Sequence, residues 1–463
     1  MTTYHFIGVG GIGMSAIARI LLARNESVSG SDVSLTPLVE QLRDEGVRIT
    51  IGHDARNIRD AHTVVVSSAI DRGNPECLAA ARSGIPLLHR GEMLARLLAG
   101  RRGISVCGTH GKTTTTAMTH AVLRRGGIDA GLALGGIDVA LGSNAHDGSS
   151  PWFVTEADES DGSFALLEPS MAIVTNIEND HLTSDDELPG LARAFAEFLA
   201  RLPEGGLAVI GIDNPLAASL TSHDLRARIA TFGFDPRASA QATNLRFEHF
   251  GSRFDVRYGD RRLGSVELRV PGAMNVQNAL AAIVIGHELG IAFATISGAL
   301  RDFRGVRRRF EILVSSPRLT LVDDYAHHPT AVLATIAAAR QYHCGELVVA
   351  FQPHRYSRTA FLAREFAQAL RGADRIYLAP VYAASEPPIP GVSERSIGEA
   401  LVTLGREVAY VRSVGELEDR LLDEVPPGAM VLMLGAGDIT DAAARLANRL
   451  SVTALPRAAP VRA

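Results

Sequence analysis

The stretch GTHGKTTTT, residues 108–116, carries the residue types that bind nucleotide phosphates, and its Lys112 is the only lysine among 46 lysine and arginine residues. Gly108 and Gly111 would let backbone N–H groups approach phosphates closely. Lys112 would place a compact ammonium on the β and γ oxygens, and Thr113 would offer a hydroxyl to Mg2+. A planar guanidinium cannot replace the ammonium in so tight a loop, which explains the exception. The stretch therefore predicts an ATP site, although its glycines stand three residues apart where the usual phosphate loop has five.

Acidic side chains follow predicted strands in the same part of the chain. Oxygen ligands with one imidazole suit Mg2+ that is bound partly through nucleotide phosphates. The alternative for any single carboxylate is a solvated loop charge, and for the histidine a satisfied buried position. The candidates are Glu156, Asp158, Glu159, Asp161, Asp180 and His181.

A second glycine-rich stretch, FIGVGGIGMSAIA at residues 6–18, follows a predicted strand and opens a predicted helix. Its glycines could bring backbone amides to a diphosphate at the helix N-terminus. Asp32 ends the next strand, where a ribose-binding acid would lie. A dinucleotide is the usual interpretation of this pattern, a UDP-sugar the less common one, and tight packing without a ligand the third.

Two further groups of polar residues lie in the last third of the chain. Arg307, Arg308 and Arg309 could steady transferring phosphoryl charge, with a basic surface run as the alternative. The stretches DDYAHHPT and FQPHRYSR, residues 323–330 and 351–358, lie at the ends of predicted strands. Two imidazoles alone would indicate zinc, but nearby arginines repel a cation. We therefore favour a pocket that binds a carboxylate or handles phosphate.

Composition excludes several classes of function. A net charge of -5 and a pI near 6.3 provide no basic surface for nucleic acid or an anionic membrane. Three well-separated cysteines exclude a disulfide framework and a zinc knuckle, and suit a reducing cytoplasm. The N-terminus resembles no secretory signal, and no apolar run approaches membrane-spanning length. We expect a cytoplasmic protein without a membrane span.

Strands alternate with helices throughout, which predicts the α/β class with parallel sheets. We expect three domains: a Rossmann-like domain over 1–98, a central P-loop ATPase-like domain over 99–306, and a second Rossmann-like domain over 307–463. The central sheet is expected to be mostly parallel, with added β structure from RFDVRYG and SVELRVPG. Apolar residues at helical spacing predict an amphipathic helix over 185–202, started by a capping box at Ser184 and Glu187.

Together these motifs resemble the Mur ligase family over essentially the full chain. The matching stretches are HFIGVGGIGMSAIA, SSAI with NPE, GTHGKTTTT, EADESD, TNIENDH, RRFE, DDYAHHPT, FQPHRYSRT and PIPG. The resemblance implies that the three domains bind a UDP-sugar, ATP and an amino acid in turn.

The resemblance also implies roles for individual residues. Lys112, Arg309 and His327 would serve catalysis, and Thr113, Glu156 and His181 would hold Mg2+. The ATP-binding residues would be Gly108, Thr109, Gly111, Lys112, Thr113, Thr114, Asn278 at adenine, Asp324 at ribose and Arg309 at the γ-phosphate. The UDP-sugar site would comprise Gly10, Gly11, Gly13, Asp32, Ser67 and Ser68. Tyr325, His327, Arg355 and Arg358 would face the amino acid and the reacting carboxylate.

Within the family, the resemblance is strongest to members that join L-alanine to UDP-N-acetylmuramate, using ATP and Mg2+, for peptidoglycan synthesis. A ligase for a preformed peptide or a later amino acid, a nicotinamide-dependent dehydrogenase and a P-loop ATPase switch are the rivals. The chain could be a monomer or a homodimer. Two positions depart from the family pattern: Met274 stands where histidine is common, and Thr183 where aspartate is usual.

Overall fold

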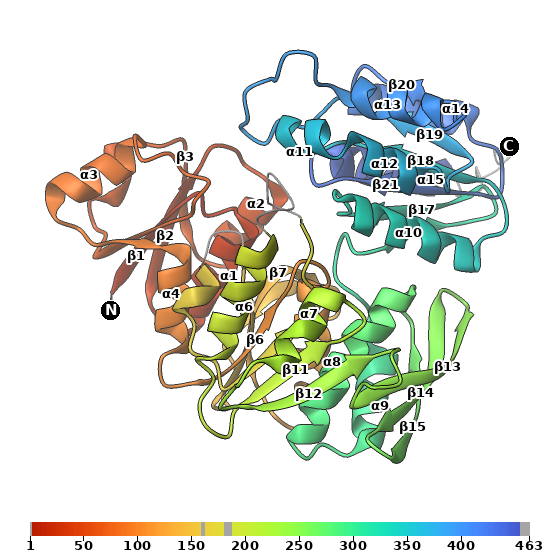
Figure 1. The fold of residues 1–463 in the computed structure, drawn as a ribbon. Coiled ribbons are helices and arrows are strands. Elements are labelled where there is room, and N and C mark those ends of the chain that lie inside the picture. The colour runs from red at the N-terminus through yellow and green to blue at the C-terminus, as the bar shows by residue number, and fades with distance from the viewer. Residues whose placement is uncertain (1, 159–162, 180–187, 454–463) are drawn as a thin grey trace, which may run out of the picture. The chain divides into compact units, whose positions relative to one another are not determined.

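The computed structural model describes residues 2–158, 163–179 and 188–453. Within these ranges the strands form three sheets, of five, ten and six strands. Figure 1 shows helices packed on each sheet. The chain divides into two compact units: unit 1 is Met1–Leu245, Phe254–Glu267 and Asn275–Val306, and unit 2 is Arg246–Arg253, Leu268–Met274 and Arg307–Ala463. The predicted α/β class, with one sheet in each of three domains, is confirmed.

The first sheet of unit 1 has the strand order β3-β2-β1-β4-β5, and all its neighbouring strands are parallel. This order places the carboxyl ends of β1, β2 and β4 side by side, as in a Rossmann-like domain. Its strands are β1 (Thr3–Ile7), β2 (Ser27–Asp32), β3 (Arg48–Ile51), β4 (Thr63–Val66) and β5 (Leu87–His89). Its helices are α1 (Ile12–Ala23), α2 (Pro37–Asp44), η1 (Ala55–Ile58), α3 (Pro75–Ser83) and α4 (Arg90–Leu98).

The second sheet of unit 1 has the order β15-β14-β13-β12-β11-β10-β6-β9-β7-β8. Strands β7, β9, β6, β10, β11, β12 and β13 pair in parallel, and β8 pairs antiparallel with β7. The predicted mostly parallel sheet with added β structure is therefore confirmed. The strands are β6 (Arg102–Cys107), β7 (Gly131–Asp138), β8 (Ser143–His146), β9 (Trp152–Glu156), β10 (Met171–Val174), β11 (Leu207–Gly211), β12 (Arg228–Gly233), β13 (Ala240–Glu248), β14 (Gly251–Tyr258) and β15 (Arg261–Leu268).

The helices that accompany this second sheet are α5 (Lys112–Arg125), η2 (Ser163–Leu166), α6 (Leu188–Leu199), α7 (Pro215–Ser219), η4 (Leu220–Ser222), α8 (Ala273–Glu288) and α9 (Phe293–Asp302). The amphipathic helix predicted over 185–202 is α6, and its Phe195 and Phe198 are buried. The predicted capping box at Ser184 and Glu187 lies outside the described residues. Strands β6, β10 and β11 are almost wholly buried, as parallel strands covered on both faces must be.

Unit 2 contains the third sheet, with the order β16-β17-β21-β18-β19-β20. All its neighbouring strands are parallel except β16, which pairs antiparallel with β17. The strands are β16 (Glu311–Ser315), β17 (Leu319–Asp324), β18 (Leu347–Phe351), β19 (Arg375–Leu378), β20 (Ala409–Tyr410) and β21 (Ala429–Leu434). The helices are α10 (Pro329–Tyr342), α11 (Tyr356–Phe361), α12 (Ala363–Leu370), α13 (Glu394–Thr403), α14 (Val414–Glu424) and α15 (Ile439–Thr453).

Candidate active site

The predicted phosphate loop connects β6 to α5 and adopts a conformation that requires its two glycines. Gly108 has φ +118° and Gly111 has φ +84°, both in the left-handed region that side chains disfavour. A Cβ atom on Gly111 would also lie 2.5 Å from Oδ1 of Asn278. The helix that follows has no side-chain cap and no acidic residue in its first turn. The backbone N–H groups and the dipole at the start of this helix therefore favour an anion.

Lys112, the first residue of α5, turns its ammonium back onto this loop. Nζ donates to the carbonyl oxygen of Gly108 at 2.7 Å and approaches that of Thr109 at 3.4 Å. The compact ammonium fits among loop carbonyls where a guanidinium would be too broad. The structure thus places the lysine ammonium against the carbonyls of the loop, and its contact with phosphates stays a prediction.

Thr113 and Glu156 meet beside the loop, although they belong to α5 and β9. The hydroxyl of Thr113 donates to Oε2 of Glu156 at 3.0 Å, and Oε1 of Glu156 accepts from the backbone N–H of Gly135. A hydroxyl and a carboxylate are the hard oxygen ligands that Mg2+ prefers, so these two residues fit the predicted metal. The third predicted ligand, His181, lies outside the described residues.

The other acidic candidates of this region divide into two groups. Asp158 follows β9, and its Oδ2 lies 3.8 Å from Nη2 of Arg90, at the start of α4. Glu159, Asp161 and Asp180 lie outside the described residues.

Asn278 reaches the loop from α8, much later in the chain. Its Oδ1 accepts from the hydroxyl of Thr115 at 3.1 Å, and its Nδ2 donates to Oδ1 of Asn275 at 3.0 Å. Asn278 and Thr114 are both buried. The structure therefore brings Asn278 to the ATP loop, while its contact with adenine stays a prediction.

Residues after β10 support the loop from its other side, and sequence reasoning did not identify them. The carbonyl of Asn176 accepts from the backbone N–H of Thr109 at 3.0 Å, and its Oδ1 accepts from that of His110 at 2.8 Å. The backbone N–H of Glu178 donates to the Thr109 hydroxyl at 2.8 Å. The feature that could have identified them is their position after the carboxyl end of β10, a strand that neighbours β6.

The N-terminal glycine loop connects β1 to α1 in a similar way. The helix is capped by Gly11 without a side-chain hydrogen bond, and its first turn holds no acidic residue. Oδ2 of Asp32 accepts from the backbone N–H of Gly10 at 2.8 Å, so this carboxylate ties the loop to the end of β2. Ser67 and Ser68 follow β4, which pairs with β1. Gly10, Gly11, Asp32 and the two serines thus gather at one edge of the sheet.

In unit 2, Arg309 lies between two residues with left-handed backbones. Arg308 has φ +61° and Phe310 has φ +50°. The carbonyl of Arg308 accepts from the backbone N–H of Tyr325 at 2.8 Å, and the N–H of Phe310 donates to Oδ2 of Asp324 at 2.7 Å. The guanidinium carbon of Arg309 lies 5.0 Å from the centre of the Tyr325 ring. Hydrogen bonds of the residues before and after Arg309 therefore hold its backbone in place.

Asp323 and Asp324 end β17 as buried carboxyl groups. Burial raises the pKa of Asp324 above its usual value, against the attraction of Arg309. Burial likewise raises the pKa of Asp323 to about 6, although Thr440 and Arg308 oppose the shift. Both oxygens of Asp324 accept backbone N–H groups, from Phe310 and Ala326. Asp324 thus holds this segment together, and its contact with ribose stays a prediction.

The predicted amino-acid residues begin directly after β17. The rings of Tyr325 and His327 lie 4.9 Å apart, and that of His327 lies 5.6 Å from His354 after β18. Arg355 precedes α11, with its Nε 4.0 Å from Oε1 of Glu386. Arg358 lies within α11 and is 8% exposed. Two separate stretches of sequence thus meet at the carboxyl ends of β17 and β18, the two strands that flank β21.

The sequence matches three family profiles in order along the chain. These are "Mur ligase family, catalytic domain" over residues 3–102, "Mur ligase middle domain" over 106–286 and "Mur ligase, glutamate ligase domain" over 308–437. The chain belongs to the Mur ligase family.

Full-length relatives of this Mur ligase carry the name UDP-N-acetylmuramate–L-alanine ligase. The protein from Desulforamulus reducens is 44% identical over 96% of this chain and 97% of its own length. That from Acidithiobacillus ferrooxidans is 45% identical over 95% and 96%. The crystal structure of the UDP-N-acetylmuramate-alanine ligase from Thermotoga maritima superposes with a TM-score of 0.84, at 31% identity, covering 98% of this chain and 100% of that one.

A murein peptide ligase from Psychrobacter arcticus shares the fold of this Mur ligase, with a TM-score of 0.74 at 24% identity over the full length of both chains. Over the described residues, no helix combines the length and apolar character that a membrane span requires. None of the three cysteines, all of which lie in the described residues, forms a disulfide; Cys77 and Cys107 are buried and Cys344 is exposed.

Of the two positions where this Mur ligase departs from the family pattern, one is described. Met274 lies in the first turn of α8 and packs against a hydrophobic cluster of unit 2. An apolar side chain therefore suits its surroundings. Thr183 lies outside the described residues.

Proposed function

We propose that this Mur ligase joins L-alanine to the lactyl carboxylate of UDP-N-acetylmuramate, at the expense of ATP, to supply a peptidoglycan precursor. The observation that carries the proposal is the meeting of Lys112, Thr113 and Glu156 at the phosphate loop, in a chain similar end to end to ligases with that name. Identity of 44% over nearly the whole of both chains supports the substrates as well as the reaction class.

The chemistry requires activation of a carboxylate, because oxide is too poor a leaving group for attack by an amine. A carboxylate oxygen attacks the γ-phosphorus of ATP, and ADP leaves, so that an acyl phosphate forms. The amine then attacks the acyl carbon, and phosphate leaves with the oxygen that came from the carboxylate. The protein must hold anionic reactants in line and offset their repulsion.

In this proposal the residues of the phosphate loop bind the nucleotide. Backbone N–H groups at the start of α5 cradle the phosphates, and the Lys112 ammonium moves from the loop carbonyls onto the β and γ oxygens. Thr113 and Glu156, with His181, would hold Mg2+, which supplies charge neutralisation on the phosphate oxygens. Arg309 steadies the charge of the transferred phosphoryl group.

The residues of unit 2 serve the amino acid in this proposal. Tyr325, His327, Arg355 and Arg358 bind its carboxylate and orient its amine. His327 either removes a proton from that amine or positions it, and the hydrogen bond between its Nδ1 and the Tyr325 carbonyl, 2.8 Å long, holds the ring for both roles. The N-terminal glycine loop, with Asp32, Ser67 and Ser68, binds the UDP-sugar.

The cellular setting belongs to the proposal too. We infer a cytoplasmic enzyme, because ATP and nucleotide sugars are supplied there and free thiols suit a reducing compartment. It would act as a monomer or a homodimer, without nucleic acid or a membrane.

One assay tests this function against its rivals. Phosphate release is measured with ATP, Mg2+ and UDP-N-acetylmuramate while L-alanine, glycine, L-serine and the tripeptide are supplied in turn. We expect strong dependence on L-alanine. Preference for the tripeptide would instead favour a peptide ligase, and undiminished release without UDP-N-acetylmuramate would favour an ATPase switch. Tight binding of NAD would favour a dehydrogenase.

A further inference from the structure

Glu76, in the first turn of α3, carries a carboxylate that is completely buried in the N-terminal domain. It accepts hydrogen bonds from the Ser31 hydroxyl at 2.6 Å, from Nδ2 of Asn57 at 2.6 Å and from the backbone N–H of Asp54 at 3.2 Å. Nε2 of His5 lies 3.4 Å away. Donors from three separate segments, β1, β2 and η1 with its N-cap Asp54, therefore converge on one carboxylate.

These donors keep the buried group ionised. Burial by itself would raise the pKa of Glu76, but hydrogen bonds from His5, Ser31 and Asn57 outweigh it and hold the pKa below its usual value. A buried anion is costly unless its lone pairs are all used. A carboxylate at this position is thus suited to ordering the segments that donate to it.

The segments it orders lead to the proposed UDP-sugar site. Ser31 immediately precedes Asp32 at the end of β2. The loop after β3 lies beside it, because the backbone N–H of Gly52 donates to the carbonyl of Asp32 at 2.8 Å. His53 belongs to this loop, and its Nδ1 lies 3.0 Å from the Ser31 hydroxyl and 3.6 Å from Oε2 of Glu76.

The hydrogen-bond partners assign the proton on His53. A serine has one hydroxyl proton, and Ser31 donates it to Glu76, which as a carboxylate can only accept. The bond between Ser31 and His53 therefore needs its proton from Nδ1 of the imidazole. In the neutral ring this leaves a lone pair on Nε2. Among the described residues Nε2 has no partner, and the side chain remains 17% exposed.

We propose that Glu76 is a positioning residue for the UDP-sugar site. Through Ser31 it fixes His53 beside Asp32 with the proton on Nδ1, so that Nε2 accepts a hydrogen bond from an N–H or O–H group of the uridine. The inference rests on the proposed function, in which the UDP-sugar binds at the carboxyl ends of β1, β2 and β4.

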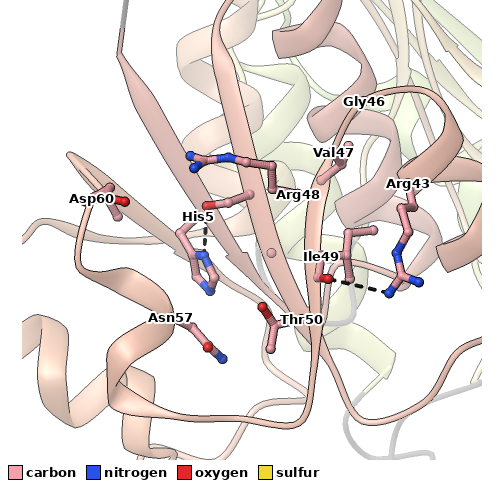
Figure 2. A pocket seen from close by; sticks show the side chains of 12 residues that line it. His5, Arg43, Gly46, Val47, Arg48, Ile49, Thr50, Asn57 and Asp60 are labelled. Carbon is pink, nitrogen blue, oxygen red and sulfur yellow. Dashed lines mark hydrogen bonds between the residues drawn. The ribbon is translucent and has the colours of Figure 1, made fainter.

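Residues on the other side of the hydrogen-bond network around Glu76 provide a control. His5 and Asn57 line a cavity of about 460 Å³ beside this sheet. Figure 2 shows these two side chains, and Nδ1 of His5 is hydrogen-bonded to the Ser29 hydroxyl at 3.0 Å. Arg48 also lines the cavity, from the amino end of β3. His53 lies beyond the opposite, carboxyl end of β3. If Glu76 influences UDP-sugar binding through His53, substitution of Arg48 should therefore not change that binding.

The test compares Glu76→Gln, His53→Ala and the double variant in steady-state kinetics, with Arg48→Ala and the exposed Glu40→Gln as controls. Each single variant should raise KM for UDP-N-acetylmuramate about tenfold, the effect of losing one hydrogen bond, with kcat and KM for ATP within about twofold. The double variant should be no worse than the worse single one. The controls should leave all three constants unchanged.

Two outcomes would overturn the inference: unchanged KM in both single variants, or a double variant whose effects multiply. If Glu76→Gln fails to fold, Ser31→Ala removes only the bridging hydroxyl and must raise the same KM. Long-range 1H–15N spectra of the wild-type protein should show the His53 proton on Nδ1, and a proton on Nε2 alone would contradict the assignment. Calorimetry distinguishes a failure of this inference from a failure of the proposed function. If the wild-type protein does not bind UDP-N-acetylmuramate, the proposed function itself is refuted.

Discussion

The two glycine loops of unit 1 share the order strand, loop and helix, but they differ in backbone conformation at the helix start and in the side chains around them. Each connects a buried parallel strand to a helix whose first turn has neither a side-chain cap nor an acidic residue. The loop before α1 contains no lysine or arginine of its own, although the Arg90 guanidinium lies beside Gly13 in the first turn of the helix, and Asp32 holds the loop in place through Gly10. The loop before α5 adds Lys112, Thr113 and the nearby Glu156.

The difference separates two requirements, binding of phosphate by the backbone and stabilisation of phosphoryl transfer by charged side chains. Backbone N–H groups at a helix N-terminus suffice to hold a diphosphate that does not change. A phosphoryl group in transfer needs charges placed on the oxygens where charge develops. In the proposed function the first loop binds the UDP-sugar and the second carries the chemistry, so substitutions in the two loops should have different kinetic signatures.

The largest effect is expected from Lys112→Arg in the second loop. The broader guanidinium cannot enter the loop, so kcat should fall by roughly 1,000-fold or more, as for loss of a principal electrostatic contact. Circular dichroism and melting temperature should stay near the wild-type values. Arg124→Lys, an exposed change on the same helix, is the matched control. Near-normal turnover in Lys112→Arg would remove the distinction between the two loops.

A slightly smaller effect is expected from Glu156→Gln. The neutral amide weakens the proposed Mg2+ site beside Thr113, so kcat should fall by roughly 100-fold or more. The Mg2+ concentration for half-maximal activity should rise, and Mn2+ binding in the presence of ATP, followed by electron paramagnetic resonance, should weaken. Glu168→Gln replaces an exposed carboxylate of the same unit and should change neither. An unaltered Mg2+ requirement in Glu156→Gln would speak against a metal at this position.

In the first loop, Asp32→Ala should impair binding rather than chemistry. It removes a charge-assisted hydrogen bond to Gly10 worth about 2 kcal/mol, so KM for UDP-N-acetylmuramate should rise roughly 30-fold while KM for ATP stays constant. Asp32→Asn keeps an acceptor for the Gly10 N–H and should lose less. An equal rise in both KM values would show that the two loops do not act separately.

The smallest effect concerns the helix behind the second loop. His120 of α5 is buried, and desolvation, reinforced by His146, lowers its pKa from 6.5 to about 4. As the pH falls, His120 takes up a proton in the unfolded chain before it does so in the folded protein. The free energy of unfolding contributed by neutral His120 is therefore complete above pH 6.5 and declines as the pH falls toward 4. Between pH 7.5 and 5 the wild type should lose about 2 kcal/mol more than His120→Gln in urea unfolding. An identical pH dependence in both proteins would refute this. Helix α1, which follows the first loop, contains no histidine, so we expect no pH-dependent stability of this kind from it.

Much of this arrangement was accessible from the sequence, because local rules govern it. Strand, glycine loop and helix follow one another in both loops, and Glu156 follows a strand in the same domain. The proximity of Asn278 to Gly111 was accessible only through the family resemblance, since nothing local to α8 specifies which loop it meets. The supporting role of Asn176 was also hidden, because it depends on β10 being the neighbour of β6.

The same limit applies to residues whose packing depends on a distant core. Residues 246–253 and 268–274 group with unit 2, where Phe250 and Met274 pack against its hydrophobic cluster. Alternating apolar residues identify a strand but do not indicate which core will bury them. Likewise, the paired backbone carbonyls and amides that fix Arg309 require two non-glycine residues with positive φ, which no sequence pattern predicts.

The most direct test of the whole account follows the oxygen atoms of the carboxylate. UDP-N-acetylmuramate carrying 18O in both lactyl carboxylate oxygens is converted with ATP, Mg2+ and L-alanine, and the released phosphate is analysed by mass spectrometry. Activation through an acyl phosphate predicts one labelled oxygen in each phosphate and the other in the amide product. Unlabelled phosphate would show that the carboxylate never reaches the γ-phosphorus, and the account would be wrong.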